Sequence, residues 1–367
     1  MRAPSRWIVS GSFDLAWILA PGLLPLLFVA LVPSFRAEGA ELLAPGFLLL
    51  VVGVDVAHVY STLYRTYLDP EEFSRRRFTY LGVPFVCLTA GVLLHRASPL
   101  GFWRGLAYLA VLHFVRQQIG LVRLYARRMG ERSRLDDRLD RAAVYAATLY
   151  PILWWHLHPR AFSWFVPGDF LALSASWAPG LEQVGRWAWA GTLGAFALRQ
   201  AWRWRREGVW NPGKTGVVAV TALSWYGGIV VFNSDIAFTA TNVVAHGVPY
   251  LALIWLYCSR KWSGAPGKAS WLSWISAGRR ILAFYGLLFV LAYVEEGVWD
   301  VLVWRDHPGL FGAWPSVWRP QGERVLAVLV PLLALPQAVH YVLDALIWRF
   351  DPKANPGLAE HLLGVKA

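Results

Sequence analysis

The chain has 367 residues, of which 56% are hydrophobic and only 16% are charged, with 22 Trp and two Cys. A soluble domain carries about 25% charged residues, so this composition excludes a cytosolic enzyme and a disordered, collagen-like or disulfide-stabilised chain. The net charge of +12 at pH 7 comes without a zinc-finger spacing or other nucleic-acid-binding motif, so no nucleic-acid partner is expected. The sequence predicts a protein that crosses a membrane several times.

Ten apolar stretches are long enough to span a bilayer, which takes about 17 to 25 helical residues. They cover residues 14–33, 42–64, 79–95, 105–125, 142–158, 184–201, 215–233, 236–258, 281–304 and 324–348. Most of the 35 Lys and Arg residues lie in alternate segments between these stretches, including both ends of the chain. Because cytoplasmic loops accumulate positive charge, we expect ten spans with both termini in the cytoplasm.

The expected fold class is all-α, a polytopic transmembrane helix bundle. Residues 1–350 are predicted to form a single bundle domain, and residues 351–367 a short cytoplasmic tail. The connecting loops are too short for a second, soluble domain. We expect an integral, multi-pass protein of the bacterial inner (cytoplasmic) membrane.

Four of the expected spans each carry one His that shares a helix face with a polar residue three or four positions away. The pairs are Asp55 with His58, His113 with Gln117, Asn242 with His246, and His340 with Asp344. In the expected topology all four spans run from outside to inside, and each His lies in the half nearest the cytoplasm. The four histidines are therefore predicted to share one layer of the membrane.

Four imidazoles at one depth, with oxygen-bearing side chains beside them, are a donor set typical of a transition-metal centre in a helix bundle. The predicted ligands are His58, His113, His246 and His340, and the carboxylates of Asp55 and Asp344 bind the metal or orient the imidazoles. Non-haem iron is the expected metal, and copper and zinc are compatible with the same donors. A packing role, in which the histidines only form hydrogen bonds, is the alternative for any one of them.

Four further polar residues are predicted to act on the substrate. Gln117 and Asn242 lie beside the positions that a metal would leave open for oxygen and substrate. Arg116 is one turn from His113 and deeper than a cation needs to be to reach the interface. Tyr341 directly follows His340.

A second acidic group, Glu295, Glu296 and Asp300, lies in the outer half of the span 281–304. We expect the helix to end near Tyr293 and an exposed amphipathic turn to follow it. A proton or cation path is the functional alternative.

The helical stretch from Leu335 to Asp344 (LPQAVHYVLD), continued to Arg349, resembles the histidine-aspartate helices of bacterial Brp/Blh-type beta-carotene dioxygenases. His58 and His113 look like members of a similar scattered histidine set. The stretches 113–118 and 242–250 are also similar to a group of bacterial polytopic membrane proteins. The resemblance implies intramembrane histidines that hold iron.

The residues and the resemblance together predict a membrane-embedded oxygenase or oxidase that acts on a lipophilic substrate, a lipid or an isoprenoid. Its expected partners are membrane lipids, the substrate and an electron donor. Two other functions fit the same histidines: a haem-binding electron-transfer protein, with the histidines as two axial pairs, and a proton-coupled transporter, with the His and Asp residues as a relay. We rank the metal-dependent enzyme first.

Overall fold

The structure is a computed structural model that describes residues 5–262, 271–276, 280–314 and 322–364. The described residues form helices and connecting segments, with no β-strand among them. The chain divides into two compact units, unit 1 with residues 1–41 and 110–249, and unit 2 with residues 42–109 and 250–367. The division falls inside two long helices, α6 (Pro99–Arg128) and α11 (Val244–Trp262). The expected single domain stays a prediction.

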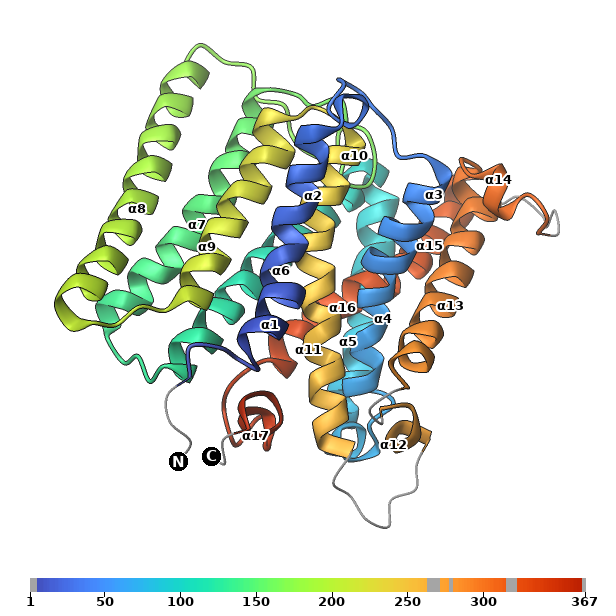
Figure 1. Cartoon of the computed structure of the whole chain (residues 1–367). Helices are drawn as coiled ribbons and strands as arrows, with labels where there is room; N and C mark the ends of the chain where they lie inside the picture. The colour runs from blue at the N-terminus through green and yellow to red at the C-terminus, as the bar shows by residue number, and fades with distance from the viewer. Residues whose placement is uncertain (1–4, 263–270, 277–279, 315–321, 365–367) are drawn as a thin grey trace. The chain divides into compact units, whose positions relative to one another are not determined.

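Unit 1 is built on α7, which packs against both α8 and α9 (Figure 1). In the N-terminal segment of this unit, α2 packs against α9. The elements are α1 (Gly11–Asp14), η1 (Leu15–Leu19), α2 (Ala20–Leu31), η2 (Pro33–Phe35), α7 (Arg134–Leu157), α8 (Ala178–Glu207), α9 (Pro212–Trp225), η5 (Tyr226–Val231), α10 (Asp235–Phe238) and η6 (Thr239–Val243).

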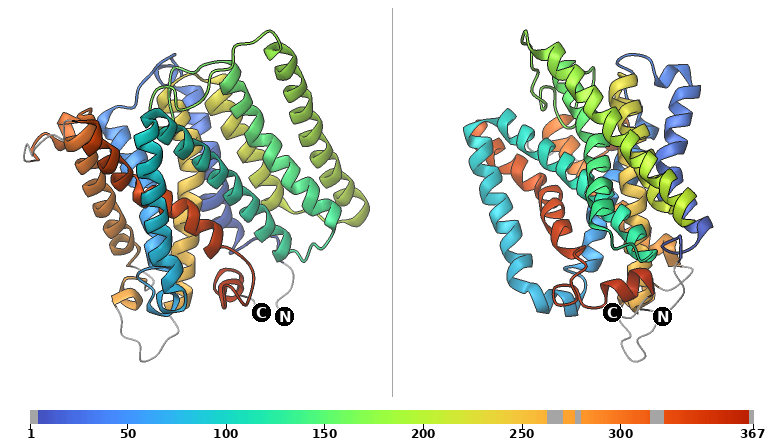
Figure 2. Two further views of the ribbon diagram at one scale, coloured as in Figure 1. Left: turned by 180° about the vertical axis from the view of Figure 1, so that it is seen from behind. Right: turned by 90° about the vertical axis from the view of Figure 1, so that its left-hand side faces the viewer.

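In unit 2, α15 and α16 lie against α5, and α13 packs on α4 (Figure 2). The elements are α3 (Ala44–Gly46), η3 (Phe47–Val56), α4 (Ala57–Ser61), η4 (Thr62–Arg65), α5 (Pro70–Ala97), α12 (Trp271–Ile275), α13 (Ile281–Trp299), η8 (Asp300–Trp304), α14 (Pro308–Phe311), α15 (Glu323–Leu333), α16 (Leu335–Ile347) and α17 (Leu358–Leu363).

Seven helical segments among the described residues are long and apolar enough to cross a membrane, and each overlaps an expected span. They are Gly11–Leu31, Ala44–Arg65, Pro70–Ala97, Pro99–Arg128, Pro212–Val231, Asp235–Trp262 and Ile281–Trp304. An eighth span results if α15 and α16, which meet at a bend of 41°, cross as one. The chain is therefore an integral membrane protein.

The two other expected spans, 142–158 and 184–201, coincide with α7 and α8. Both are helices of 24 residues or more, but neither has the apolar character of the other eight. The count of ten and the cytoplasmic termini stay predictions.

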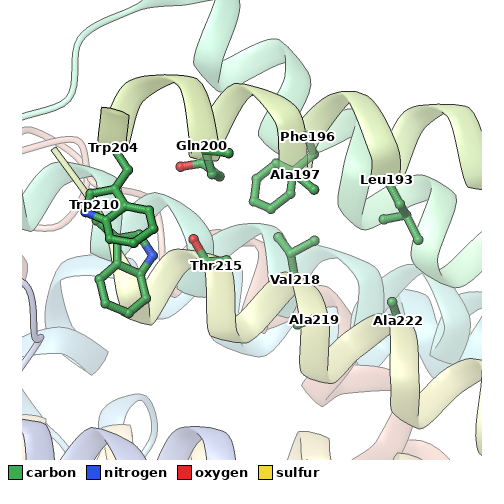
Figure 3. Close-up of a pocket in the computed structure, with 11 residues that line it drawn as sticks. Leu193, Phe196, Ala197, Gln200, Trp204, Trp210, Thr215, Val218, Ala219 and Ala222 are labelled. Carbon is green, nitrogen blue, oxygen red and sulfur yellow. The ribbon is translucent and has the colours of Figure 1, made fainter. Parts of the chain in front are cut away.

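Helix α8 packs chiefly on α7, and this leaves a groove of about 340 Å³ along its side facing α9 (Figure 3). Apolar side chains such as Leu193, Phe196 and Val218 line most of it. Trp204 and Trp210 close one end, with their ring centroids 6.1 Å apart. Aromatic residues at this end of α8 suit the boundary between lipid and water.

The short tail beyond residue 350 is folded onto unit 2. Its helix α17 buries Leu358, Leu362 and Leu363. Arg260, in the last turn of α11, donates hydrogen bonds to the carbonyls of His361 and Leu362, at 3.2 and 2.7 Å. The tail predicted at 351–367 is thus an ordered part of the fold over its described residues.

Unit 1 carries a buried ionic network where α7, α8 and α9 come together. Lys214 is fully buried and pairs with Glu131 at 2.7 Å and with Asp140 at 3.0 Å. Arg203 of α8 also reaches Glu131, at 2.9 Å. Buried carboxylates are tolerated only when paired, so Lys214 holds these segments together.

Replacing Lys214 by Met removes the cation that pairs with the buried carboxylate of Asp140 and leaves Glu131 with Arg203 alone. We expect Lys214→Met to lower the free energy of unfolding by about 3–5 kcal/mol. Thermal unfolding in detergent measures the loss. The control is Arg186→Met, which removes a half-exposed cation of α8 and should cost less than about 1 kcal/mol. Equal effects of the two substitutions would contradict a structural role for the buried network.

Candidate metal centre

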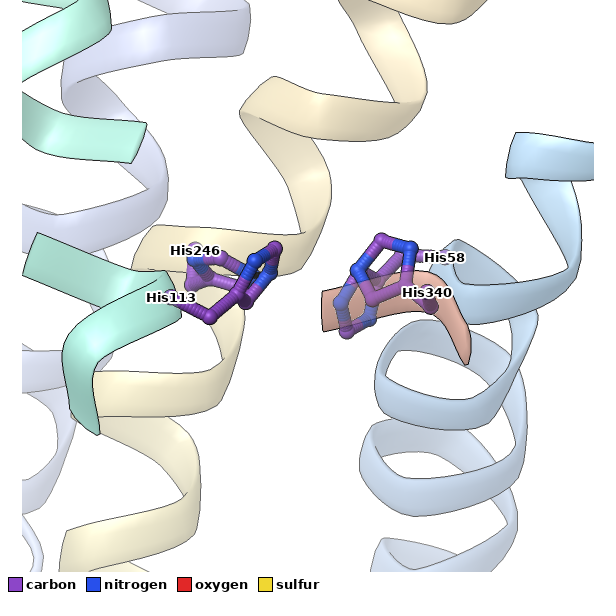
Figure 4. A group of neighbouring side chains, drawn as sticks. All are labelled: His58, His113, His246 and His340. Carbon is purple, nitrogen blue, oxygen red and sulfur yellow. Dashed lines mark hydrogen bonds between the residues drawn. The ribbon is translucent and has the colours of Figure 1, made fainter. Parts of the chain in front are cut away.

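Within unit 1, the imidazoles of His113 of α6 and His246 of α11 face each other (Figure 4). Their Nε2 atoms are 3.0 Å apart, and both side chains are buried. The ring of His246 also stacks on Phe114, with centroids 3.7 Å apart and planes at 8°. This stacking fixes the plane of the His246 ring, so that its Nε2 atom faces His113.

Gln117, one turn after His113, ties α6 to the backbone of the second histidine. Its Nε2 donates to the carbonyl oxygen of His246 at 2.8 Å. Its other polar atom, Oε1, is buried and has no hydrogen-bond partner. Gln117 therefore lies beside the imidazole pair, as the sequence predicts, and presents an unused acceptor.

Asn242 precedes His246 by one turn and lies in η6, a π-helical segment directly before α11. Its Nδ2 donates to the carbonyl of Phe238 at 3.2 Å and to Thr241 Oγ1 at 3.1 Å. The side chain is buried, and its Oδ1 has no hydrogen-bond partner. π-Helical turns occur often at functional sites because they shift side chains out of the regular helical register.

A glycine makes room for this turn. A Cβ atom on Gly228 would lie 2.1 Å from Thr241 Oγ1 and 2.5 Å from Asn242 Nδ2. Both distances are shorter than any van der Waals contact. The residue at 228 must lack a side chain for Thr241 and Asn242 to hold their positions.

Within unit 2, His58 of α4 and His340 of α16 form a pair whose ring centroids are 4.9 Å apart, with the ring planes at 82° (Figure 4). Both side chains are buried, with 1% exposure. Asp55 Oδ1 lies 3.6 Å from His58 Nδ1. The carboxylate and the imidazole share one helix face, as their spacing of three residues predicts.

A hydroxyl holds His340. Thr62 Oγ1 lies 2.7 Å from His340 Nδ1 and 3.0 Å from the hydroxyl of Tyr250. The Tyr250 hydroxyl in turn interacts with the buried side chain of Asp344. Asp344 thus reaches His340 through Tyr250 and Thr62 as well as through their shared helix.

Thr62 and Tyr250 are functional candidates that were not among the predicted site residues. Thr62 follows His58 by four residues, so it lies on the helix face that carries Asp55 and His58. That spacing was the available signal. Serine and threonine are common in membrane helices, where the hydroxyl often donates to a backbone carbonyl of the same helix. The residue type therefore did not distinguish Thr62 as a partner of His340.

The four histidines are all buried, and each offers one ring nitrogen such that the four atoms lie within 4.8 Å of one another. Within the described parts of the chain, no further histidine belongs to this group. A set of imidazoles at this spacing can bind a metal ion, and imidazole is a ligand for several transition metals, so the donors alone do not identify the ion.

The remaining predicted site residues are divided. Tyr341 is buried, and its hydroxyl accepts a hydrogen bond from Gln337 Nε2 at 3.0 Å. Arg116 is exposed, although His113 on the preceding turn is buried. The structure therefore places Arg116 on the outer side of α6.

The acidic group of unit 2 differs from expectation. Helix α13 does not end near Tyr293 but continues to Trp299, and η8 extends it to Trp304. Glu295 and Glu296 are half-buried and Asp300 is buried. The expected exposed turn is wrong because apolar residues, among them Val298 and Trp299, continue the helix past the two glutamates.

Comparison with known proteins identifies no relative: the chain matches no family model, no curated protein and no solved structure.

The contact of Thr62 with His340 predicts a specific effect of its hydroxyl. Thr62→Val keeps the side-chain shape but removes the hydrogen bond to Nδ1, and second-sphere losses of this kind weaken metal affinity about 10–100-fold. Competition with a chelator measures the affinity. Thr66→Val is the matched control, because the Thr66 hydroxyl bonds the backbone of its own helix. Similar losses in both variants would contradict the assignment.

The glycine at 228 gives a second test. Gly228→Ala forces Thr241 and Asn242 to shift, and overpacking of this kind costs about 1–3 kcal/mol. We expect lower thermal stability together with weaker metal retention. In the control, Gly191→Ala on α8, the added Cβ meets nothing within 4 Å. A Gly228→Ala protein as stable as this control would show that the η6 turn does not need the space.

Proposed function

We propose that the protein is a membrane metalloenzyme in which His58, His113, His246 and His340 hold one transition-metal ion. The observation that carries the proposal is the approach of four buried imidazole nitrogens to within 4.8 Å of one another. On the resemblance of the 335–349 helix, the expected metal is non-haem iron and the expected reaction is oxygenation or oxidation of a lipid or isoprenoid.

The spacing of one pair supports a shared metal. Metal–imidazole bonds of about 2.0–2.1 Å put two ligands about 2.9 Å apart at a right angle, and about 3.4 Å apart at the tetrahedral angle. The Nε2 atoms of His113 and His246 are 3.0 Å apart. An N–H···N hydrogen bond has the same length, so metal analysis distinguishes the two.

The same distance disfavours a haem between these two histidines. Two axial ligands on opposite sides of one iron are separated by about 4 Å, twice the metal–nitrogen bond. A separation of 3.0 Å is too short for that arrangement. The haem-binding alternative therefore ranks lower for this pair.

The groups around the Nδ1 atoms support the same assignment. Metal-bound histidines usually engage a carboxylate, a carbonyl or another polar group through their second ring nitrogen. Asp55 lies beside Nδ1 of His58, and Thr62 beside Nδ1 of His340. With Nδ1 engaged in this way, the Nε2 atoms of His58 and His340 would be the nitrogens that bind the metal.

A bound iron would supply the capacity to activate oxygen, and the chain supplies the surroundings. The buried imidazoles lie in an apolar protein that excludes water. Gln117 Oε1 and Asn242 Oδ1 are buried acceptors without partners. An unsatisfied buried acceptor costs about 1–3 kcal/mol, so each favours a water or substrate hydroxyl that donates to it.

The setting of the site favours a lipophilic substrate that enters from the bilayer. Such an enzyme suits the bacterial inner membrane, with ten spans and both termini in the cytoplasm. Membrane lipids, the substrate and an electron donor are its proposed partners. A proton-coupled transporter would use the same histidines without a metal. The metal content of the purified protein distinguishes this function from the proposed enzyme.

Metal content and optical absorption of the detergent-purified protein test the proposal. We expect about one non-haem metal ion per chain, without the Soret band of a haem. The ion should be lost in His58→Ala, His113→Ala, His246→Ala and His340→Ala, since each removes a ligand. The control is His156→Ala, because His156 Nδ1 bonds the carbonyl of Leu171 outside the group. Metal-free protein, or equal metal in all five variants, would contradict the proposal.

A further inference from the structure

A strongly charged groove of about 520 Å³ lies in unit 1 where α6 ends and α7 begins. Twelve residues line it, and ten of these are charged. The arginines are Arg123, Arg127, Arg132, Arg134, Arg138 and Arg141, and the acidic residues are Glu131, Asp136, Asp137 and Asp140. The lining alone is only modestly positive, so the balance depends on where the acidic residues find their partners.

Cations behind the groove neutralise the buried acidic residues. Glu131 and Asp140 bind Lys214, and Glu131 also binds Arg203. Asp136 binds Arg199 at 2.7 Å. None of these three cations lines the groove. Their charge therefore cancels that of these three carboxylates and leaves Asp137 as the acidic residue of the lining that pairs with lining arginines.

The pKa values of Glu131 and Asp136 agree with this picture, whereas burial outweighs Lys214 at Asp140 and raises the pKa of that carboxyl to about 6. Burial opposes ionisation of Glu131, but Lys214, Asn211 and Arg203 outweigh it and lower the pKa of this carboxyl. Burial also opposes ionisation of Asp136, and Arg199 outweighs it, so its pKa is lowered too. Both groups are carboxylates at neutral pH and stay bound to their partners.

The fourth acidic residue forms its ion pairs with arginines of the groove lining. Asp137 pairs with Arg123 at 3.1 Å and with Arg141 at 2.9 Å. Three other arginines of the lining, Arg132, Arg134 and Arg138, are exposed, and none forms an ion pair with a carboxylate of the described residues. These three cations are available to an anion.

The groove begins at the end of a helix that is long and apolar enough to span a membrane, where a lipid headgroup would lie. The membrane-spanning helix α6 ends at Arg128, so the residues that follow it leave the apolar layer. Leu135, between Arg134 and Asp136, is 63% exposed and can contact an acyl chain. Ser133 caps the first turn of α7, whose N-terminus adds positive potential. Basic pockets beside membrane helices are suited to phosphate-bearing headgroups.

We infer that this groove binds the headgroup of an anionic phospholipid, with Arg132, Arg134 and Arg138 around the phosphate. The guanidinium groups donate paired hydrogen bonds to phosphate oxygens, which an ammonium group cannot do with the same geometry. The site is independent of the proposed metal centre, and neither requires the other.

Native mass spectrometry of the full-length protein in detergent tests this inference. Phosphatidylglycerol and phosphatidylcholine with identical acyl chains are added in turn, and the bound fraction is measured. We expect a first phosphatidylglycerol to bind more tightly than phosphatidylcholine. Each arginine near a headgroup contributes about 1 kcal/mol, or about fivefold in affinity. The triple variant Arg132→Gln, Arg134→Gln and Arg138→Gln should therefore lose most of the preference.

The control is Arg205→Gln with Arg206→Gln, which removes two exposed arginines at the end of α8 outside the groove. It should keep the preference for phosphatidylglycerol. Equal binding of both lipids by the wild-type protein overturns the inference without any variant. An equal loss in the control and the triple variant also overturns it, because general charge would then explain the binding. Displacement of the lipid by millimolar inorganic phosphate would assign the groove to free phosphate instead.

Discussion

Four imidazoles are buried inside this membrane protein, and their burial constrains the helices that carry them. A buried polar ring is costly unless its nitrogens have polar neighbours, because lipid and apolar side chains offer none. One nitrogen of each ring has such a neighbour: Asp55 Oδ1 lies 3.6 Å from His58 Nδ1, Thr62 Oγ1 lies 2.7 Å from His340 Nδ1, and the Nε2 atoms of His113 and His246 are 3.0 Å apart. Each histidine thus needs a second residue at a fixed place, and the helices that carry them must keep their register.

Three of the four histidines lie next to an irregular part of their helix, a π-helical segment or a bend. The π-helical segment η3 ends just before α4 and holds Asp55, and η6 ends just before α11 and holds Asn242. The helix of His340 follows a 41° bend. Such departures weaken the helical hydrogen bonding, which is expensive in a membrane. Their occurrence beside three of the four histidines indicates that the local geometry serves the site.

Much of the fold could be predicted from the sequence, because a membrane-spanning helix is recognisable from the length and apolar composition of its segment. The seven helices with the most apolar character, and the bent pair at the C-terminal end, all overlap expected spans. Helices α7 and α8 were harder, since they mix apolar residues with charge. The division into two compact units falls inside α6 and α11, and no feature of the sequence predicted it. The continuation of α13 past Glu295 and Glu296 was missed because exposed and half-buried acidic residues look alike in sequence.

Residue spacing predicted the members of the candidate site more accurately than it predicted where each helix begins and ends. A spacing of three or four residues pointed to His58 with Asp55, and His113 with Gln117, because such pairs share a helix face. What spacing could not reveal was the contact between helices, such as Thr62 with His340 or Gln117 with the backbone of His246. Nor could it reveal that Arg116 lies on the exposed side of α6.

X-ray absorption at the edge of the bound metal shows whether the four histidines bind one metal ion. We expect a first coordination shell that contains four imidazole nitrogens at about 2.0–2.2 Å, with the multiple-scattering pattern of imidazole rings. A first shell of oxygen or sulfur without imidazole scattering would contradict it, and so would a shell with only one or two imidazoles.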